Sequence, residues 1–168
     1  KIRNKNFQLQ SAYQYVAYNR AVELMLSKDY QNALETFKKV STYPIEKDLI
    51  ALAHFWQGEI LYNLSSYSRA IAAFNKFMKD GSSYGSGKFE LAQYNLGYSN
   101  FKMERYQEAI SWFRKFIDKP GDNKALIPDA LVRIADGYFV TKKYKDAIAY
   151  YDKSYDLKGE EIDYALYQ

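Results

Sequence analysis

The feature that most constrains this chain is a short motif that recurs four times at a nearly fixed interval. Each copy begins with tyrosine, has alanine three positions later followed by an apolar residue, and carries an aromatic residue seven positions after the tyrosine. The copies are Tyr30–Phe37, Tyr67–Phe74, Tyr106–Phe113 and Tyr144–Tyr151, and their tyrosines are 37, 39 and 38 residues apart. A regular period of this length is typical of proteins in which one supersecondary unit stacks on the next.

A very small residue stands nine positions before each of these tyrosines. The four are Ala21, Gly58, Gly97 and Ala135. Apolar residues recur at helical intervals, as in Leu91, Tyr94 and Tyr98, and no alternating strand pattern occurs. If each unit is two antiparallel helices, the small residues let the backbones approach closely, while the tyrosine and the later aromatic fill the space alongside. The sequence therefore predicts an all-α fold, a right-handed superhelical solenoid of four helix-turn-helix repeats plus the start of a further helix.

The periodicity also predicts where the helices lie. They are expected near residues 9–27, 30–42, 46–64, 67–79, 87–103, 106–118, 127–141 and 144–157. Paired, they give a single domain over residues 1–168, with repeats at about 9–44, 46–80, 87–120 and 127–158. Residues 160–168 are expected to be the truncated start of a next repeat, so we interpret the chain as a fragment of a larger protein.

These residues resemble the tetratricopeptide repeat family, whose signature has a small residue in the first helix and a tyrosine, an alanine and an aromatic residue in the second. Two features depart from it: the family's tryptophan near the start of the first helix is absent, and the period exceeds the usual length of about 34 residues. The residues in place of the tryptophan are Ala17, His54, Gln93 and Leu131. The long period and the abundance of Tyr, Lys and Asn are similar in style to bacterial outer-membrane assembly lipoproteins and the Tol-Pal coordinator.

The resemblance implies a ligand groove lined by the first helix of each pair. The predicted protein-binding residues are Tyr18, Phe55, Glu59, Tyr62, Tyr94, Tyr98, Phe101 and Phe139, and Tyr15 falls on the same face. Such aromatic side chains give a large contact area at small entropic cost, which suits an extended or helical protein segment. The alternative is that each of them packs against neighbouring helices instead. The lysine, asparagine and arginine with which some family members grip chaperone tails are missing at these positions, so we exclude that ligand.

No residue set points to catalysis, and we expect that the chain is not an enzyme. It has no cysteine, and its one histidine, His54, falls where the family places a large packing side chain. A metal site or a nucleophile-base pair would need further groups converging on His54, and the spacing suggests none. The stretch 81–88 resembles a phosphate-binding loop, but it follows a helix and lacks the required Gly and Ser or Thr, so it is interpreted as an inter-repeat turn. No catalytic residue, metal or cofactor is predicted.

The charge pattern bears on the class of partner. The net charge of +4 comes from lysines that are interleaved with acidic residues, whereas a nucleic-acid footprint concentrates basic residues on one face. No nucleic-acid partner is therefore expected. No apolar run approaches the roughly 18 to 20 residues of a membrane-spanning helix, so no membrane insertion by this chain is expected.

These features favour a protein-protein interaction scaffold that binds a peptide or protein segment in an aromatic concave groove, in a bacterial cell-envelope assembly with a periplasmic or cell-envelope location. Two alternatives stay open. The chain could be a structural arm that self-associates through its truncated C-terminal repeat, or it could bind glycan or peptidoglycan by stacking sugars on the aromatic face. A cytoplasmic location is the alternative compartment. The identity of the partner is not predicted.

Overall fold

A computed structural model describes residues 7–157 of the chain. The described residues form α-helices and two short 3-10 helices, with no strand among them. The chain divides into two compact units, residues 1–88 (unit 1) and residues 89–168 (unit 2), and each is described by itself. The single domain expected over residues 1–168 stays a prediction, and the helix start expected at 160–168 lies outside the described residues.

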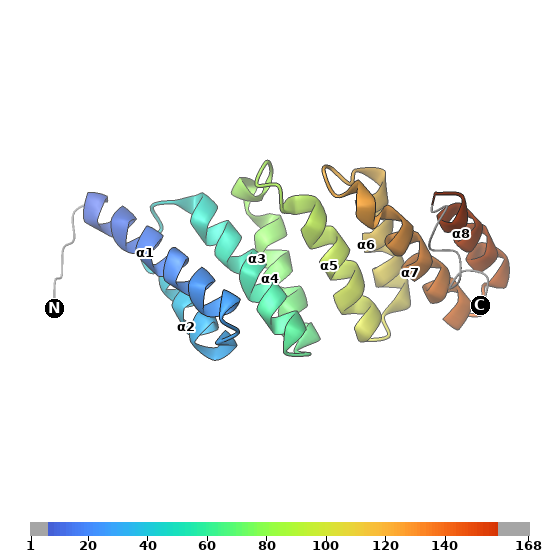
Figure 1. The fold of residues 1–168 in the computed structure, drawn as a ribbon, viewed down its shortest axis with the longest axis horizontal. Helices are drawn as coiled ribbons and strands as arrows, with labels where there is room; N and C mark the ends of the chain where they lie inside the picture. The colour runs from blue at the N-terminus through green and yellow to red at the C-terminus, as the bar shows by residue number, and fades with distance from the viewer. Residues whose placement is uncertain (1–6, 158–168) are drawn as a thin grey trace. The chain divides into compact units, whose positions relative to one another are not determined.

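Unit 1 contains two helix pairs, each joined by a short turn (Figure 1). Its helices are α1 Phe7–Leu26, α2 Tyr30–Val40, α3 Lys47–Asn63 and α4 Tyr67–Lys79. The 3-10 helix η1, Gly81–Ser83, follows α4 and lies against α3 and α4. Asp80 caps η1 by accepting a hydrogen bond from the backbone N–H of Ser82 at 3.0 Å, and Ser83 is completely buried. The stretch predicted to be an inter-repeat turn is therefore an ordered turn.

Unit 2 repeats this arrangement. Its helices are α5 Phe89–Lys102, α6 Tyr106–Asp118, α7 Ile127–Val140 and α8 Tyr144–Leu157, with the 3-10 helix η2 Lys124–Leu126 before α7. In both units the second helix of one pair packs on the first helix of the next, α2 on α3 and α6 on α7. The eight predicted helices are all present, and their ends differ from the prediction by at most about two residues.

The turn inside each pair has one design in all four repeats. The residue two positions before the repeat tyrosine is Lys28, Ser65, Glu104 or Lys142, and its φ lies between 56° and 62°. Its neighbours close the helix end with backbone bonds, such as Asp29 N to Leu24 O at 2.9 Å and Ser66 N to Leu61 O at 2.8 Å. A left-handed conformation costs a residue with a Cβ about 1 kcal/mol, so the surrounding packing holds each turn in place.

The two glycines among the small residues, Gly58 and Gly97, are explained by an aromatic ring of the partner helix. A Cβ built on Gly58 would stand 2.6 Å from the Phe74 ring, and one on Gly97 would stand 2.7 Å from the Phe113 ring. Phe74 and Phe113 are the aromatics seven positions after the repeat tyrosines, and both are completely buried. The ring thus packs directly against the glycine, and this contact fixes how closely the two helices of a pair approach.

Candidate functional site

The first helices of the two pairs in unit 1, α1 and α3, form a surface that is called the first-helix face. It carries an aromatic pair held together by a hydrogen bond. Trp56 on α3 donates from its indole Nε1 to the hydroxyl of Tyr18 on α1 at 2.9 Å, and the Tyr18 ring packs edge-on against Phe37 at 6.0 Å. Both side chains are half-buried. Burial raises the pKa of Tyr18, while the hydrogen bond from Trp56 lowers it. Tyr15, one turn earlier on α1, is 48% exposed.

Phe55 does not belong to this surface, and its prediction as a contact residue is wrong. It is completely buried, with ring centroids 5.0 Å from Trp56, 5.8 Å from Phe74 and 5.5 Å from Phe77. Its neighbour Trp56, which was not predicted from the sequence, occupies the surface instead. Lys88 Nζ lies 5.3 Å from the Trp56 ring centroid, a cation–π distance. The sequence feature that could have indicated Trp56 is the tryptophan itself, because its amphipathic indole is common at binding surfaces. It stands one position after Phe55, the residue that was predicted instead.

In unit 2 the first-helix face is a polar network rather than an open aromatic surface. Tyr94 and Tyr98 on α5 both donate to Asp129 Oδ2 on α7, at 2.7 Å and 2.5 Å. Their rings pack on the buried ring of Phe113 at 5.8 Å and 5.3 Å. Burial and the hydrogen bond to Asp129 raise the pKa of Tyr98 to about 12, and the same causes raise the pKa of Tyr94. Arg133 lies 3.6 Å from the other Asp129 oxygen, so this carboxylate is surrounded by donors.

Three further predicted contact residues occupy one equivalent position of the repeat, near the end of the first helix. Tyr62, Phe101 and Phe139 each stand five positions before the repeat tyrosine, and each packs edge-on against that tyrosine at 5.3 to 5.7 Å. These contacts join the end of the first helix to the start of the second. Phe139 is 42% exposed, and Tyr62 and Phe101 are half-buried, as is Glu59. Their recurring contact is the closure of the turn within each pair, and part of each side chain stays accessible.

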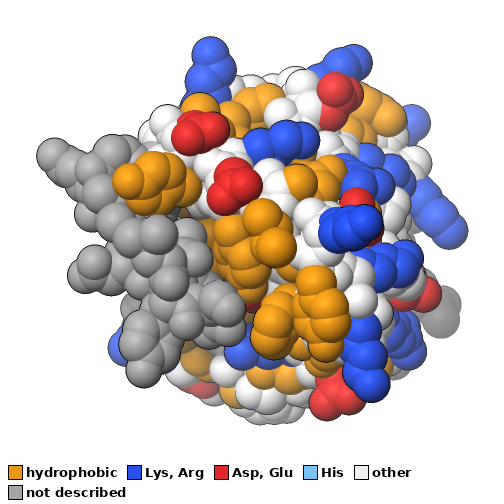
Figure 2. Space-filling model, turned by 90° about the vertical axis from the view of Figure 1, so that its right-hand side faces the viewer, with side chains coloured by type: hydrophobic (Ala, Val, Ile, Leu, Met, Phe, Trp, Pro, Cys, Tyr) orange, Lys and Arg blue, Asp and Glu red, His pale blue; other side chains and the backbone are white. Residues whose placement is uncertain are grey.

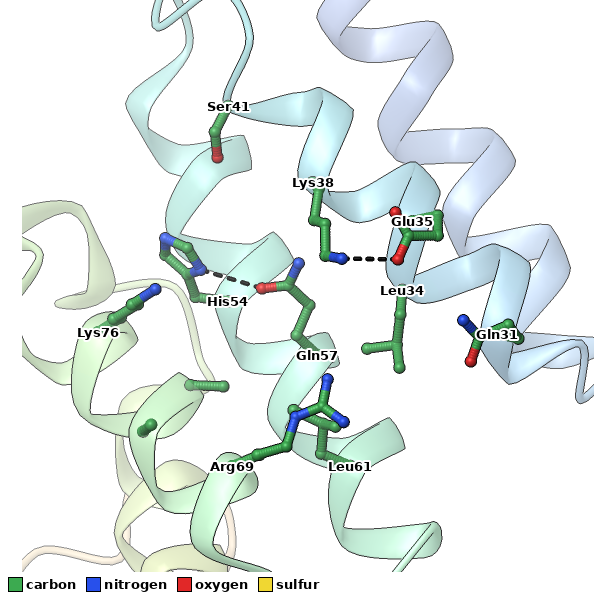
Figure 3. A pocket seen from close by; sticks show the side chains of 12 residues that line it. Gln31, Leu34, Glu35, Lys38, Ser41, His54, Gln57, Leu61, Arg69 and Lys76 are labelled. Atoms are coloured by element: carbon green, nitrogen blue, oxygen red, sulfur yellow. Dashed lines mark hydrogen bonds and ion pairs between the residues drawn. The ribbon is translucent and has the colours of Figure 1, made fainter. Parts of the chain in front are cut away.

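A pocket that was not predicted from the sequence lies among α2, α3 and α4 of unit 1 (Figure 3). It has a volume of about 520 Å³, with α2 and α4 as walls and α3 between them. Its lining is mostly polar and basic, and comprises Gln31, Leu34, Glu35, Lys38, Ser41, His54, Gln57, Leu61, Arg69, Ala72, Ala73 and Lys76. His54 therefore faces a pocket instead of filling a core position, and its Nδ1 lies 3.2 Å from Gln57 Oε1.

The pocket lining holds no serine and histidine pair joined by a hydrogen bond. His54 is bonded to an amide, and the hydroxyl of Ser41, which also lines the pocket, has no hydrogen bond to His54. Among residues 7–157, no cluster of His, Cys, Asp and Glu side chains could hold a metal ion. None of the helices in that range has both the length and the apolar character needed to cross a bilayer.

The C-terminal end of unit 2 exposes apolar side chains. On α7 and α8 the exposed large hydrophobic residues are Phe139, Val140, Tyr144, Ile148, Tyr155 and Leu157. Figure 2 shows hydrophobic side chains gathered on this end of the molecule.

Comparison with known structures supports this fold. MamA from Desulfovibrio magneticus RS-1 is 21% identical, with a TM-score of 0.74 over 90% of this chain and 79% of that one. YrrB, described as a TPR protein with an unusual peptide-binding site, is 17% identical, with a TM-score of 0.73 over 95% of this chain and 76% of that one. No curated protein sequence matches the chain. The resemblance to outer-membrane assembly lipoproteins and the Tol-Pal coordinator gains no support from these matches.

Family models identify the repeats directly. Two models described as tetratricopeptide repeat match the chain, one over residues 18–83 and the other over residues 91–118. These matches fall on α1 to α4 and on α5 and α6, and together they cover more than half of the chain. The chain belongs to the tetratricopeptide repeat family.

Proposed function

We propose that the chain is a protein-interaction scaffold whose first-helix face in unit 1 binds a peptide or protein segment. The observation that carries the proposal is the Tyr18–Trp56 pair, in which two half-buried aromatic rings are locked by a hydrogen bond beside the exposed ring of Tyr15. Rings held in one orientation lose little entropy when a ligand binds, and tyrosine and tryptophan are common anchors at interfaces. The peptide-binding site named for YrrB, which has a similar fold, is consistent with this class of function.

The two units contribute differently to this function. In unit 2 the hydroxyls of Tyr94 and Tyr98 are already bonded to Asp129, and their rings pack on Phe113. A ligand at this face of unit 2 meets tyrosine hydroxyls that already donate hydrogen bonds to a carboxylate of the protein. In unit 1 the Tyr15 ring is exposed at the surface. We therefore place the main contact on α1 and α3 of unit 1.

Selection from a displayed random-peptide library tests the proposal, because it requires no identified partner. Recovered peptides should bind the purified chain with micromolar affinity, as is common for a few aromatic anchors. The variant Tyr15→Ser should weaken that binding about tenfold or more, since exposed aromatic anchors carry much of such energy. Tyr84→Ser, which removes an exposed tyrosine from the loop after η1, is the matched control and should leave binding unchanged.

Two results would contradict the proposal. If no peptide is enriched, or if the enriched peptides bind Tyr15→Ser as well as the parent chain, the first-helix face of unit 1 is not the binding surface. Concentration-dependent association of the chain in analytical ultracentrifugation, lost when Ile148 and Tyr155 are replaced by serine, would support a self-associating arm instead. A cell-envelope location is a further part of the proposal, and fractionation of the source cells with an antibody to the chain tests it.

A further inference from the structure

The pocket of unit 1 differs from the proposed groove in its chemistry, because it is lined by cations and amides rather than rings. We infer that this pocket binds an acidic segment of a partner protein, gripping two carboxylates that lie about 10 Å apart. The inference rests on the proposed scaffold function and names the chemistry of a partner at a second surface. It does not depend on the first-helix face.

The charges around the pocket are unbalanced. Three cations line it, Lys38, Arg69 and Lys76, against a single carboxylate, Glu35. Glu35 is already paired with Lys38 at 2.6 Å. Within the part of the chain that the structure describes, Arg69 and Lys76 have neither an ion pair nor a side-chain hydrogen bond. Two uncompensated cations at a hollow attract an anionic ligand.

Neutral donors add to this attraction. An amide oxygen only accepts, so the contact between His54 and Gln57 Oε1 is one in which His54 Nδ1 donates. The Gln57 amide nitrogen then keeps two N–H groups for another acceptor. In Figure 3 the Lys76 ammonium points toward His54, while the Gln57 amide lies toward His54 and Lys38 and away from Arg69. Lys76 therefore lies beside the polar pair of His54 and Gln57, and Arg69 stands at the other end of the pocket.

The spacing of the two cations selects the ligand. Arg69 and Lys76 are seven residues apart on α4, which places their backbones about 10 Å apart along the helix axis. In Figure 3 the two cationic groups lie at different ends of the pocket, so one carboxylate or one phosphate placed beside one of them does not contact the other. In a peptide with the polyproline II conformation, residues three positions apart lie on the same side and are separated by about 9 Å, so two acidic residues at that spacing match the two cations. The volume of about 520 Å³ falls in the range of ligand-binding pockets and admits such side chains.

The pocket exists because small side chains border it. Ala72 and Ala73 stand on the α4 wall, and Leu61 reaches it from α3. A larger side chain at Ala73 would extend into the space between α2 and α4. The hollow is therefore a consequence of residue choice in this repeat.

The test uses the whole chain and fluorescein-labelled serine-glycine peptides. One peptide carries two glutamates three positions apart, a second carries the glutamates side by side, and a third carries glutamines in their place. Binding is followed by fluorescence anisotropy at low salt. The double variant Arg69→Gln, Lys76→Gln removes the two free cations, and Lys39→Gln, Lys79→Gln is the matched control, because it removes the same charge from exposed positions outside the pocket.

The spaced-glutamate peptide should bind the parent chain and the control variant alike and lose affinity about tenfold or more on the Arg69→Gln, Lys76→Gln variant. The adjacent-glutamate and glutamine peptides should bind more weakly. The inference is overturned if no acidic peptide binds, if the glutamine peptide binds equally well, or if the control variant loses as much affinity. Inorganic phosphate that competes at the same concentration as the peptide would also overturn it, since one anion would then suffice.

The outcomes separate the two proposals. Library peptides that depend on Tyr15, together with acidic peptides that do not bind, would remove the pocket inference alone. Acidic peptides that depend on Arg69 and Lys76, together with a library that yields no Tyr15-dependent binder, would remove the first-helix proposal alone.

Discussion

The same positions of the repeat line an open pocket in unit 1 and hold packed side chains in unit 2. Counted from the repeat tyrosines, Lys38, Leu61 and Ala73 of the pocket correspond to Arg114, Tyr138 and Tyr150. In unit 2 these three side chains stack on one another. Arg114 donates to the hydroxyl of Tyr150 at 3.0 Å and to that of Tyr138 at 2.5 Å, and its guanidinium lies 5.5 and 5.6 Å from their ring centroids.

The inner wall of the two sites differs as well. His54 and Gln57 on α3 correspond to Leu131 and Ile134 on α7, which are buried apolar residues. One backbone arrangement thus yields a basic pocket in one unit and a closed aromatic stack in the other. A repeat protein can therefore place a binding site in one repeat by the size and polarity of a few side chains, without changing its helices.

The largest expected effect is a loss of stability when the core is disturbed. If both units share one core design, this loss should be equal in the two units. Gly58→Ala and Gly97→Ala each place a methyl group under a buried phenylalanine ring, so each should lower the free energy of unfolding by about 1–3 kcal/mol. Urea denaturation measures both. Gly81→Ala, with no atom within 4 Å of the added Cβ, should change stability by less than about 0.5 kcal/mol. Very unequal losses at Gly58 and Gly97 would show that the cores differ.

Removing the cation from the aromatic stack of unit 2 should cost more stability than removing the equivalent cation from the pocket of unit 1. Arg114→Ala takes away two hydrogen bonds and two cation–π contacts and should cost about 1–2 kcal/mol. Lys38→Ala removes an ion pair whose side chains are 60% and 54% exposed, so it should cost at most about 0.5 kcal/mol. Urea unfolding of both variants measures the difference. Equal losses would mean that the aromatic stack contributes nothing beyond a surface ion pair.

The first-helix faces can be compared through alkaline titration. In unit 2 the pKa of Tyr98 is about 12, above the value of about 10 expected in the unfolded chain. The folded state then holds this proton more tightly, so its contribution to stability is complete below pH 10 and is lost as the pH rises toward 12. Tyr98→Phe should cost about 1 kcal/mol at neutral pH. The variant should also lose less stability than the parent between pH 10 and 12.

The measurement is the free energy of unfolding in urea at several pH values for the parent and Tyr98→Phe. Tyr18→Phe is the companion variant in unit 1, where the tyrosine hydroxyl accepts from Trp56 instead of donating to a carboxylate. Parallel pH profiles for the parent and Tyr98→Phe would show that the bond to Asp129 does not hold the Tyr98 proton.

Closing the pocket of unit 1 should affect binding much more than stability. Leu61→Tyr with Ala73→Tyr gives unit 1 the two rings of unit 2 beside Lys38, and the existing space should limit the change in unfolding free energy to about 1 kcal/mol. Binding of the spaced-glutamate peptide should be abolished in the anisotropy assay. Ala149→Tyr adds a ring at an exposed position of α8 and serves as the control. Peptide binding that survives both substitutions would place the acidic ligand elsewhere.

Much of the fold could be predicted from the sequence, because its determinants are local or repeat at a fixed distance. The tyrosines of the motif mark the starts of α2, α4, α6 and α8. Each turn lies just before a repeat tyrosine, and each helix is amphipathic or enclosed by its neighbours. The left-handed residues were not predictable from their type, since lysine, serine and glutamate rarely adopt that conformation.

The candidate site could be predicted only in part. The register placed Tyr18, Tyr94 and Tyr98 on first helices, but it did not show that the last two bind one carboxylate, 35 and 31 residues away respectively. It also placed Phe55 at the surface when its neighbour Trp56 stands there. One position along a helix turns a side chain by about 100°, so a small error in register exchanges a core residue for a surface residue.

By itself, the sequence determined the helix pairs, their number and their family, because these follow from periodicity and from the motif that each repeat carries. Only the tertiary structure decided which surfaces are open. The pocket of unit 1 depends on side chains from three helices between Gln31 and Lys76, and on Leu61 and Ala73, which leave space where unit 2 has tyrosines. Space between helices depends on the sum of the side-chain volumes that meet there, and that sum is known only when the packing partners are known.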